Sequence, residues 1–394
     1  MSKRVAILGS TGSIGQNALQ VLSALGPEYE VRALTAHSRI DLLAEQVRRF
    51  QPKIAAVTHP DYASNIPSLN GFQGELLVGP QSLTEIASRD DIDIILCAIV
   101  GAAGLPALLA AARSGKRLAI ANKEPLVIAG ELLTREAAAG GAELLPIDSE
   151  HSAVFQALQA GRFEEVQRIV LTASGGPFLR SRPEEMEKAT AQQALAHPTW
   201  QMGPKITVDS ATMVNKALEV IEARWLFGLP VDKIDVLIHP ESVIHSMVEF
   251  IDGSVIAQMG TPDMKTPIQY ALTYPHRKPG LSKGLQLETL GRLTFETPDL
   301  NRFRALAIGY EVARLGGSAP VVFNAANEEA VAAFLDGKIR FGRIIDLIEL
   351  CLQKHSAQSH LSLEALLDID QWARREVQRH LESGKPTATQ KERR

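Results

Sequence analysis

Short apolar stretches alternate with helical patterns along the first part of the chain. The stretches are rich in Val, Ile, Leu and Ala, and they cover residues 5–8, 31–34, 54–57, 92–100, 117–121 and 143–147. Strands that alternate with helices form a parallel sheet with helices on both faces, because each helix returns the chain to the edge where the next strand starts. The pattern predicts an α/β domain with a parallel sheet over residues 1–148.

The pattern becomes mixed after residue 148. Residues 243–250 and 254–259 are apolar and extended, and they flank Asp252-Gly253, a strong hairpin signal. We therefore expect an α+β second domain over residues 149–279. A polar connector that contains Gly and Pro follows at 280–299.

Four helical patterns follow the connector, at residues 300–315, 321–335, 341–354 and 363–381. They are enough for a small helical bundle, which we place at residues 300–384. Residues 385–394 are charged and lack apolar periodicity, so a disordered tail is expected there.

Composition indicates an ordinary globular protein. Of 394 residues, 45% are apolar and 22% are charged, which argues against a disordered or fibrous chain. Lys and Arg total 41 and Asp and Glu total 45, a net charge of −4, so no nucleic-acid partner is expected. Two cysteines, Cys97 and Cys351, and no secretory leader predict a cytoplasmic protein without disulfides.

One uncharged segment has the length of a membrane span. Residues 94–112 contain no charge, and about 20 apolar residues cross a bilayer. Gly101, Gly104 and Pro106 interrupt the segment. We predict a buried strand, a glycine turn and an alanine-rich helix, and no membrane partner.

Residues 9–15 (GSTGSIG) follow the first predicted strand directly and open a helix. At this position backbone N–H groups and the positive end of a helix bind the pyrophosphate of a dinucleotide. The spacing is GxxGxxG rather than GxGxxG, and a plain tight turn into a helix would use the same residues. The location in the first strand–helix turn favours a nucleotide.

The end of the second predicted strand indicates which dinucleotide is bound. NAD enzymes usually place Asp or Glu about 20 residues after the glycine loop, where it binds the ribose 2′-hydroxyl. Residues 35–39 contain no acid, and Ser38 and Arg39 offer a hydroxyl and a guanidinium to a 2′-phosphate. NADP is therefore favoured over NAD. The alternative for Arg39 is a solvated residue that caps the next helix.

Charged residues follow two later strands, at the edge where open α/β sheets bind ligands. Residues 121–124 (ANKE) come after the fifth predicted strand, where a ligand role competes with a solvated loop. Asp148 and Glu150 follow the sixth, and in an extended chain residues i and i+2 point to the same side, toward one hard cation. The alternative is that Asp148 or Ser149 caps a helix that starts near His151.

A second set of polar residues lies on one predicted helix. Asp209 opens this helix, and Asn215, Lys216 and Glu219 are three or four residues apart, hence on one face. An amide, a cation and a carboxylate on one face suit a phosphate ester with a metal beside it. The alternative is an exposed salt-bridged face, with Ser210 as its N-cap.

Two loops complete the candidate site. Residues 172–177 (TASGGP) follow an apolar strand, and small residues there let backbone N–H groups surround an anion, although a hairpin turn would look similar. Residues 197–204 combine His197, Trp200, Gly203 and two prolines, as in a lid that excludes water. Trp200 could also be an ordinary core residue.

Nine motifs occur in order, and together they resemble the 1-deoxy-D-xylulose 5-phosphate reductoisomerases from the amino terminus to about residue 341. They are residues 9–15 (GSTGSIG), 98–104 (AIVGAAG), 121–124 (ANKE), 145–151 (LPIDSEH), 174–178 (SGGPF), 197–205, 208–213 (VDSATM), 215–225 and 238–247 (IHPESVIHSM). The helical end is similar only in pattern. The resemblance implies a Rossmann-like first domain, a central α+β catalytic domain with a lid at about 174–204, and a homodimer.

The implied activity is the NADPH- and metal-dependent rearrangement and reduction of 1-deoxy-D-xylulose 5-phosphate to 2-C-methyl-D-erythritol 4-phosphate, in non-mevalonate isoprenoid biosynthesis. The resemblance assigns the divalent metal, Mg, Mn or Co, to Asp148, Glu150 and Glu219. It implies catalytic roles for these three acids, Lys123 and His197. The implied substrate contacts are Lys123, Ser149, Glu150, Ser174, His197, Trp200, Ser210, Asn215, Lys216 and Glu219. The implied cofactor contacts are Thr11, Gly12, Ser13, Ile14, Asn122, Glu124 and Gly203.

One departure from the family concerns the adenosine end of the cofactor. Relatives commonly have a glycine and an asparagine where this chain has His37 and Arg39. Two other functions remain open. A semialdehyde dehydrogenase would need a catalytic cysteine, which neither Cys97 nor Cys351 suits. A non-enzymatic NADP-sensing regulator would have no need for clustered carboxylates and a lid.

Overall fold

The computed structural model describes residues 2–61, 69 and 71–383, so the predicted tail at 385–394 lies outside the described residues. The chain folds into two compact units. Unit 1 contains residues up to Pro125 together with 133–166 and 245–289, and unit 2 contains 126–132, 167–244 and the residues from Leu290 on. The domain boundaries proposed from the sequence, at 148, 279 and 299, remain predictions.

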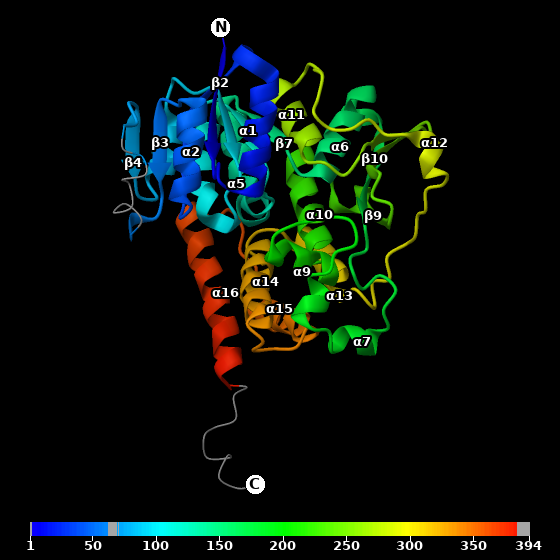
Figure 1. Ribbon diagram of the computed structural model, residues 1–394. Coiled ribbons are helices and arrows are strands. Elements are labelled where there is room, and N and C mark those ends of the chain that lie inside the picture. Colours follow the sequence, from blue (N-terminus) through cyan, green and yellow to red (C-terminus); the bar gives the residue numbers. More distant parts are fainter. Residues whose placement is uncertain (1, 62–68, 70, 384–394) are drawn as a thin grey trace. The chain divides into compact units, whose positions relative to one another are not determined.

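Unit 1 is built around a seven-stranded parallel sheet in the order β4-β3-β2-β1-β5-β6-β7 (Figure 1). The six predicted strands are confirmed, and β4 is an additional one. The strands are β1 (Lys3–Leu8), β2 (Tyr29–Ala36), β3 (Ile54–Val57), β4 (Glu75–Val78), β5 (Ile94–Cys97), β6 (Arg117–Ile120) and β7 (Glu143–Pro146). The first strand lies in the middle with its successors on either side, so the strand order reverses beside β1, which is where such sheets bind ligands.

Helices α1 (Ser13–Leu25), α2 (Ile40–Phe50) and α11 (Lys265–Thr273) contribute to one apolar core with the strands. Figure 1 shows α1 and α2 on the same side of the sheet. Helices α3 (Ser82–Ser88) and α4 (Leu105–Arg113) pack against each other and against strands of the sheet. This arrangement confirms the α/β prediction for the first region.

The uncharged segment at 94–112 has the predicted structure. It forms β5, a 3-10 turn over Gly101–Gly104 and α4, and Leu105, Leu108 and Ala111 in α4 are fully buried. None of the helices within residues 2–61, 69 and 71–383 combines the length and apolar character needed to cross a bilayer.

The remainder of unit 1 contains helices and the predicted hairpin. The hairpin consists of β10 (Ile244–Phe250) and β11 (Val255–Met259), closed where the Phe250 N–H donates to Ser254 O over 2.9 Å. Helix α6 (Ser149–Ala157) packs on β11. The other helices here are α5 (Glu124–Gly140), of which residues 126–132 belong to unit 2, and the short α12 (Leu287–Leu290).

Unit 2 combines strands with a helical region. Strands β8 (Val166–Ala173) and β9 (Ile234–Ile238) run parallel. The four predicted C-terminal helices are confirmed as α13 (Arg304–Leu315), α14 (Ala319–Leu335), α15 (Arg343–Lys354) and α16 (Leu363–Ser383). The other helices of this unit are α7 (Pro183–Glu187), α8 (Ala191–Ala194), α9 (Pro204–Thr212) and α10 (Val214–Phe227). Helix α13 packs on α10, and α14 packs on α15 and α16.

The helix predicted to start at Asp209 is wrong in its bounds. Asp209 and Ser210 lie inside α9, and Asn215, Lys216 and Glu219 lie in α10. The two helices are separated at Met213, which has a left-handed backbone with φ +64°. Ser210 is therefore not an N-cap. The break changes the direction of the chain between two sets of predicted substrate residues.

Candidate functional site

The glycine loop of unit 1 has no space for larger side chains. A Cβ on Gly9, where φ is +88°, would lie 2.7 Å from Ala98 O, and a Cβ on Gly15 would lie 2.4 Å from Gly9 O. The N-cap of α1 is Gly12, which has no side chain, so among the described residues the N-cap position supplies no side-chain hydrogen bond to this helix. The first N–H groups of α1 are therefore not bound by a capping side chain, which suits the negatively charged pyrophosphate of a dinucleotide.

Side chains from β2 and α2 brace this loop. The Gly9 N–H donates to Thr35 Oγ1 over 2.9 Å. The Ser10 hydroxyl donates to Gln46 Oε1 over 2.7 Å, and Gln46 Nε2 donates back to Ser10 O over 2.9 Å. Because Ser10 and Gln46 are both buried, these bonds fix the loop without help from solvent.

The predicted 2′-phosphate residues lie beside the glycine loop. Arg39 occupies the N-cap position of α2 but makes no side-chain cap, and its Nη2 donates to Thr11 O instead. Ser38 and His37 are exposed, and His37 Nδ1 lies 2.9 Å from Thr58 Oγ1. A guanidinium on the loop backbone agrees with a cofactor role, which remains a prediction.

The carboxyl edge of the sheet carries a buried ion pair. Lys123 follows β6 and its Nζ lies 2.7 Å from Asp148 Oδ2, with both side chains about nine-tenths buried. Asn122 Nδ2 lies 3.5 Å from Glu124 Oε2, in the first turn of α5. A lysine, an amide and two acids therefore gather at the edge where ligands bind in this type of sheet.

Asp148 and Glu150 do not lie in an extended chain, so the argument that i and i+2 point to one side is wrong. Strand β7 ends at Pro146, Asp148 is the N-cap residue of α6, and Glu150 is in its first turn. The Asp148 side chain does not cap the helix, and Ser149 Oγ donates to Glu150 Oε2. Asp148 and Glu150 nevertheless offer carboxylate oxygens within 4.8 Å of each other, close enough for one cation.

Unit 2 contains a second lysine–carboxylate pair. Lys216 Nζ donates to Glu219 Oε2 and to Thr172 O, each over 2.5 Å. Asn215 Nδ2 donates to the other Glu219 oxygen over 2.5 Å. The predicted common face of these residues is confirmed, and because Glu219 is only 1% exposed, a solvated salt-bridged surface does not describe it.

The loop after β8 approaches α9 closely. Gly175 and Gly176 have φ +85° and +65°, and a Cβ on Gly176 would lie 2.7 Å from Ser210 O. The Gly176 N–H donates to Ser174 Oγ over 3.3 Å. Ser174 and Ser210 are both predicted to bind substrate. They therefore lie on neighbouring backbone segments, the loop after β8 and α9, and a side chain at position 176 would push these segments apart.

His197 organises the loop that contains Trp200. Its Nδ1 accepts hydrogen bonds from the backbone N–H groups of Thr199 and Trp200, over 3.1 and 2.9 Å respectively. Its Nε2 lies 3.1 Å from Ser174 Oγ. Burial lowers the pKa of His197. A neutral ring that accepts at Nδ1 donates from Nε2, so the Nε2–H of His197 donates a hydrogen bond to Ser174 Oγ. Trp200 is half-buried, and Gly203 is the exposed N-cap of α9.

Family models match three stretches that together cover most of the chain. The model for 1-deoxy-D-xylulose 5-phosphate reductoisomerase matches residues 5–130, and two models for its C-terminal domains match 144–227 and 259–376. The chain belongs to the 1-deoxy-D-xylulose 5-phosphate reductoisomerase family.

Relatives and solved structures of this family extend over nearly the whole chain. The enzyme from Geotalea uraniireducens is 50% identical to this chain, and the match covers 94% of this chain and 97% of the relative. The enzyme from Chloroherpeton thalassium is 49% identical, and the match covers 95% of this chain and 97% of the relative. The structure of the Zymomonas mobilis enzyme in complex with NADPH matches this chain with a TM-score of 0.92 and 43% sequence identity. The match covers 97% of this chain and 100% of the chain in that structure. A complex with NADPH, fosmidomycin and magnesium has TM-score 0.90 and 42% identity over 96% of this chain and 98% of its own.

Motif resemblance to the family did not identify the residues that support the site. Thr35 and Gln46 brace the glycine loop from outside the quoted motifs. The signal for Gln46 was available: it is a polar residue on the apolar face of the helical pattern over 40–50, where it is now 6% exposed. Thr35 gave no such signal, because threonine is common in strands.

Proposed function

We propose that this chain converts 1-deoxy-D-xylulose 5-phosphate to 2-C-methyl-D-erythritol 4-phosphate. The observation that carries the proposal is family membership over nearly the full length, at up to 50% identity. Family membership makes the chain an NADPH-dependent oxidoreductase that uses a divalent metal. This reaction provides a precursor for isoprenoids by the non-mevalonate route.

For the cofactor, we propose that the glycine loop binds the pyrophosphate and that Ser38 and Arg39 face the 2′-phosphate. The tight loop of Gly9 and Gly15 and the uncapped start of α1 support this assignment. NADPH supplies the hydride for the reduction. The remaining contacts are proposed for Thr11, Gly12, Ser13, Ile14, Asn122, Glu124 and Gly203.

For the metal, we propose Asp148, Glu150 and Glu219 as ligands. The donor set fits a hard cation such as Mg, Mn or Co, because it contains only carboxylate oxygens. The nearness of the Asp148 and Glu150 oxygens and the burial of Glu219 support it. A bound divalent cation supplies charge that polarises substrate oxygens during the rearrangement.

For the substrate, we propose that Ser174, Ser210, Asn215 and Lys216 bind the phosphate. The backbone contact between the Gly176 position and Ser210, and the donor set of α10, support this role. Ser174 accepts from His197 and from a backbone N–H, so its own hydroxyl proton can point to a phosphate oxygen. The proposed lid is residues 174–204, with His197 and Trp200 closing over substrate, while Lys123, Ser149 and Glu150 contact its other end.

We further propose a homodimer in the cytoplasm. Strand β11 is an edge strand, and it exposes Val255, Ile256 and Met259, with Ile251 at 67% exposure in the adjacent turn. Such a row of apolar side chains on an edge strand favours pairing with a second copy. Two reduced, buried cysteines agree with the cytoplasm. Light scattering of the protein and of Ile256→Glu tests the dimer.

The alternatives receive less support. Burial raises the pKa of the Cys97 thiol to about 11, and that of Cys351 also to about 11, so neither is a nucleophile for a semialdehyde dehydrogenase. A regulator that only senses NADP gives no reason for two buried lysine–carboxylate pairs.

The direct test is NADPH oxidation with 1-deoxy-D-xylulose 5-phosphate, with and without a chelator. Glu219→Gln should fold, bind NADPH and lose most turnover, while exposed Glu311→Gln on α13 should behave as the unmodified protein. No turnover with Mg²⁺ or Mn²⁺ would refute the function. Chelator-resistant turnover, or normal turnover of Glu219→Gln, would refute the metal assignment.

A further inference from the structure

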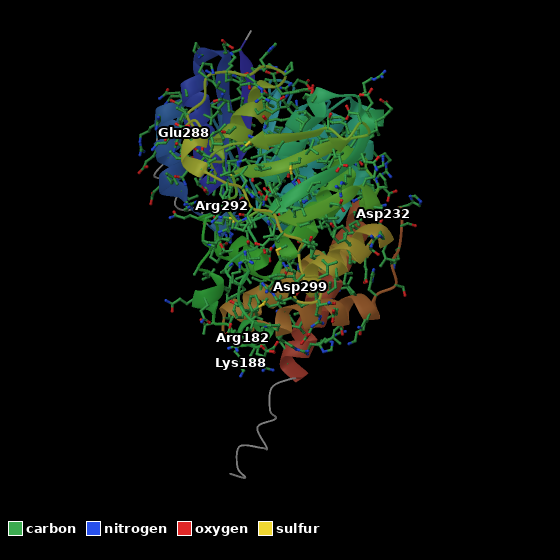
Figure 2. The ribbon with its side chains drawn as sticks, turned by 90° about the vertical axis from the view of Figure 1, so that its right-hand side faces the viewer. Arg182, Lys188, Asp232, Glu288, Arg292 and Asp299 are labelled. Carbon is green, nitrogen blue, oxygen red and sulfur yellow. The ribbon has the colours of Figure 1, made fainter. Side chains whose placement is uncertain are left out.

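A single arginine reaches the far end of the loop that contains Ser174. Arg302 lies just before α13, and its Nη2 donates to Phe178 O over 3.0 Å and to Leu179 O. The turn that presents Arg302 is fixed in its own right, since Asp299 Oδ1 accepts hydrogen bonds from the N–H groups of Asn301 and Arg302 over 3.1 Å each. Asp299 is labelled in Figure 2.

The loop from Ser174 to Phe178 needs an anchor at each end. It contains Gly175 and Gly176, both with positive φ, and glycine gives a chain more conformational freedom than any other residue. At its start the loop leaves β8, where Ala173 O accepts the His239 N–H over 2.7 Å. At its end the only side-chain donors to the Phe178 and Leu179 carbonyls, within the part of the chain that the structure describes, come from Arg302.

The same end of the loop is held by aromatic packing. Phe178 is 7% exposed, and its ring lies 5.1 Å from that of Phe341, which in turn lies 5.5 Å from Phe334 of α14. The guanidinium carbon of Arg302 lies 4.7 Å from the ring centre of Phe303. The end of the loop is therefore held in two ways, by Phe178 packing on Phe341 and by the arginine, whose guanidinium itself packs on Phe303.

The contacts of Arg302 are not those expected of a side chain that contributes only to the stability of the fold. Among the described residues it has no carboxylate partner within ion-pair distance, and its Nε is buried without a hydrogen-bond partner. A buried donor without a partner costs free energy. What the side chain does achieve is a pair of hydrogen bonds from one nitrogen, Nη2, to two successive loop carbonyls.

We propose that Arg302 is a positioning residue for phosphate binding: it fixes the end of the loop Ser174–Phe178 so that Ser174 keeps its place beside Ser210. This inference rests on the proposed function, in which both serines bind the substrate phosphate. Without Arg302 the end of the loop loses its side-chain donor and keeps the packing of Phe178 and the bond from the Ser181 N–H to Phe178 O, which is 3.1 Å long. The phosphate then binds a loop that must first be ordered, which weakens substrate binding.

The experiment is steady-state kinetics of Arg302→Gln and Arg302→Lys, with Arg304→Gln as the matched control. Arg304 lies two residues further along, and its ion pairs with Asp346 and Glu349 are on the surface. We expect Arg302→Gln to raise the Michaelis constant for 1-deoxy-D-xylulose 5-phosphate by about tenfold, the effect of one lost charge-assisted hydrogen bond. The Michaelis constant for NADPH should not change, and Arg304→Gln should leave both constants unchanged.

A double-mutant cycle with Ser174→Ala separates positioning from a general loss of stability. If Arg302 acts through Ser174, the double variant should have a Michaelis constant close to that of Ser174→Ala alone. If the fold-increases in the Michaelis constant of the two single variants multiply in the double variant, the proposal is overturned. Multiplication would mean that Arg302→Gln weakens substrate binding independently of Ser174, as a general loss of stability would. An unchanged substrate constant in folded Arg302→Gln would also overturn it.

Arg302→Lys keeps the test decisive if the glutamine variant does not fold. The lysine variant retains the charge, but its nitrogen is one bond closer to Cα than Arg302 Nη2 and does not reach both carbonyls equally well. Its substrate constant should therefore also rise, by less than in Arg302→Gln where both fold. An unchanged constant contradicts the proposal. The unmodified enzyme distinguishes the two levels of inference: if it shows no turnover, the proposed function fails, whereas normal turnover with an unaffected Arg302→Gln refutes the positioning role alone.

Discussion

Gly176→Ala and Gly228→Ala form a matched pair that separates backbone strain from damage to the phosphate site. Both glycines have nearly the same left-handed backbone, with φ +65° and +64°. A Cβ on Gly228 would meet nothing within 4 Å, whereas a Cβ on Gly176 would lie 2.7 Å from Ser210 O. An alanine in this conformation costs about 1–2 kcal/mol, so both variants should lose at least that much stability, and Gly176→Ala should lose more because of its contact with Ser210 O.

Only Gly176→Ala should also affect substrate binding. Ordinary contact begins at 3.4 Å, so the loop and α9 must move apart by about 0.7 Å. A hydrogen bond to phosphate that is stretched this far is largely lost, and such a bond contributes about 1.5–3 kcal/mol, or roughly ten- to a hundredfold in the substrate Michaelis constant.

Denaturant unfolding and steady-state kinetics on both variants test this reasoning. Gly228→Ala should be destabilised with an unchanged substrate constant, and Gly176→Ala should show both effects. The argument is refuted if the two variants lose equal stability and their substrate constants agree within about twofold.

Three further predictions address other parts of the site. Arg39→Ala should raise the Michaelis constant for NADPH by about tenfold, and an unchanged constant would show that this guanidinium does not bind the 2′-phosphate. Because burial lowers the pKa of His197 below 6.5, its contribution to stability is complete above pH 6.5 and declines as the pH falls below that value, when protonation removes the acceptor at Nδ1. The fluorescence of Trp200, identified with a Trp200→Phe control, should change over this acidic range, and a flat profile from about pH 8 to 5 would contradict the prediction. Calorimetry should show that a phosphonate analogue tightens Mg²⁺ binding by the same factor by which Mg²⁺ tightens binding of the analogue, and independent binding would contradict the coupling.

The sequence was sufficient for elements that carry a strong local signal. Buried parallel strands appear in the sequence as continuous apolar runs. In the amphipathic C-terminal helices apolar residues recur every three to four positions, so both kinds of element were predicted. Strand β4 was missed because it is short and half-exposed, with the burial of an edge strand rather than of a core strand.

Local propensity was not sufficient where the chain changes direction. Met213 ends α9 in a left-handed conformation that methionine rarely adopts, so nothing in the residue type predicts a break there. The alternative prediction that Asp148 caps a helix gave its place correctly, at the N-cap position of α6. The Asp148 side chain, however, pairs with Lys123 instead of capping that helix. That choice depends on a residue 25 positions earlier in the sequence, which spacing alone does not reveal.

The two lysine–carboxylate pairs give a physical reason for binding metal and substrate together. Asp148 holds the ammonium of Lys123, and Glu219 holds that of Lys216, each at a buried position. Under the proposed metal assignment, a divalent cation on these carboxylates would compete with both ammonium groups, because like charges repel strongly where water is excluded. Metal binding alone would then be opposed by the two lysines. In the same proposal the substrate contacts both lysines, Lys216 through its phosphate and Lys123 at its other end, so substrate and cation would each make the other's binding more favourable.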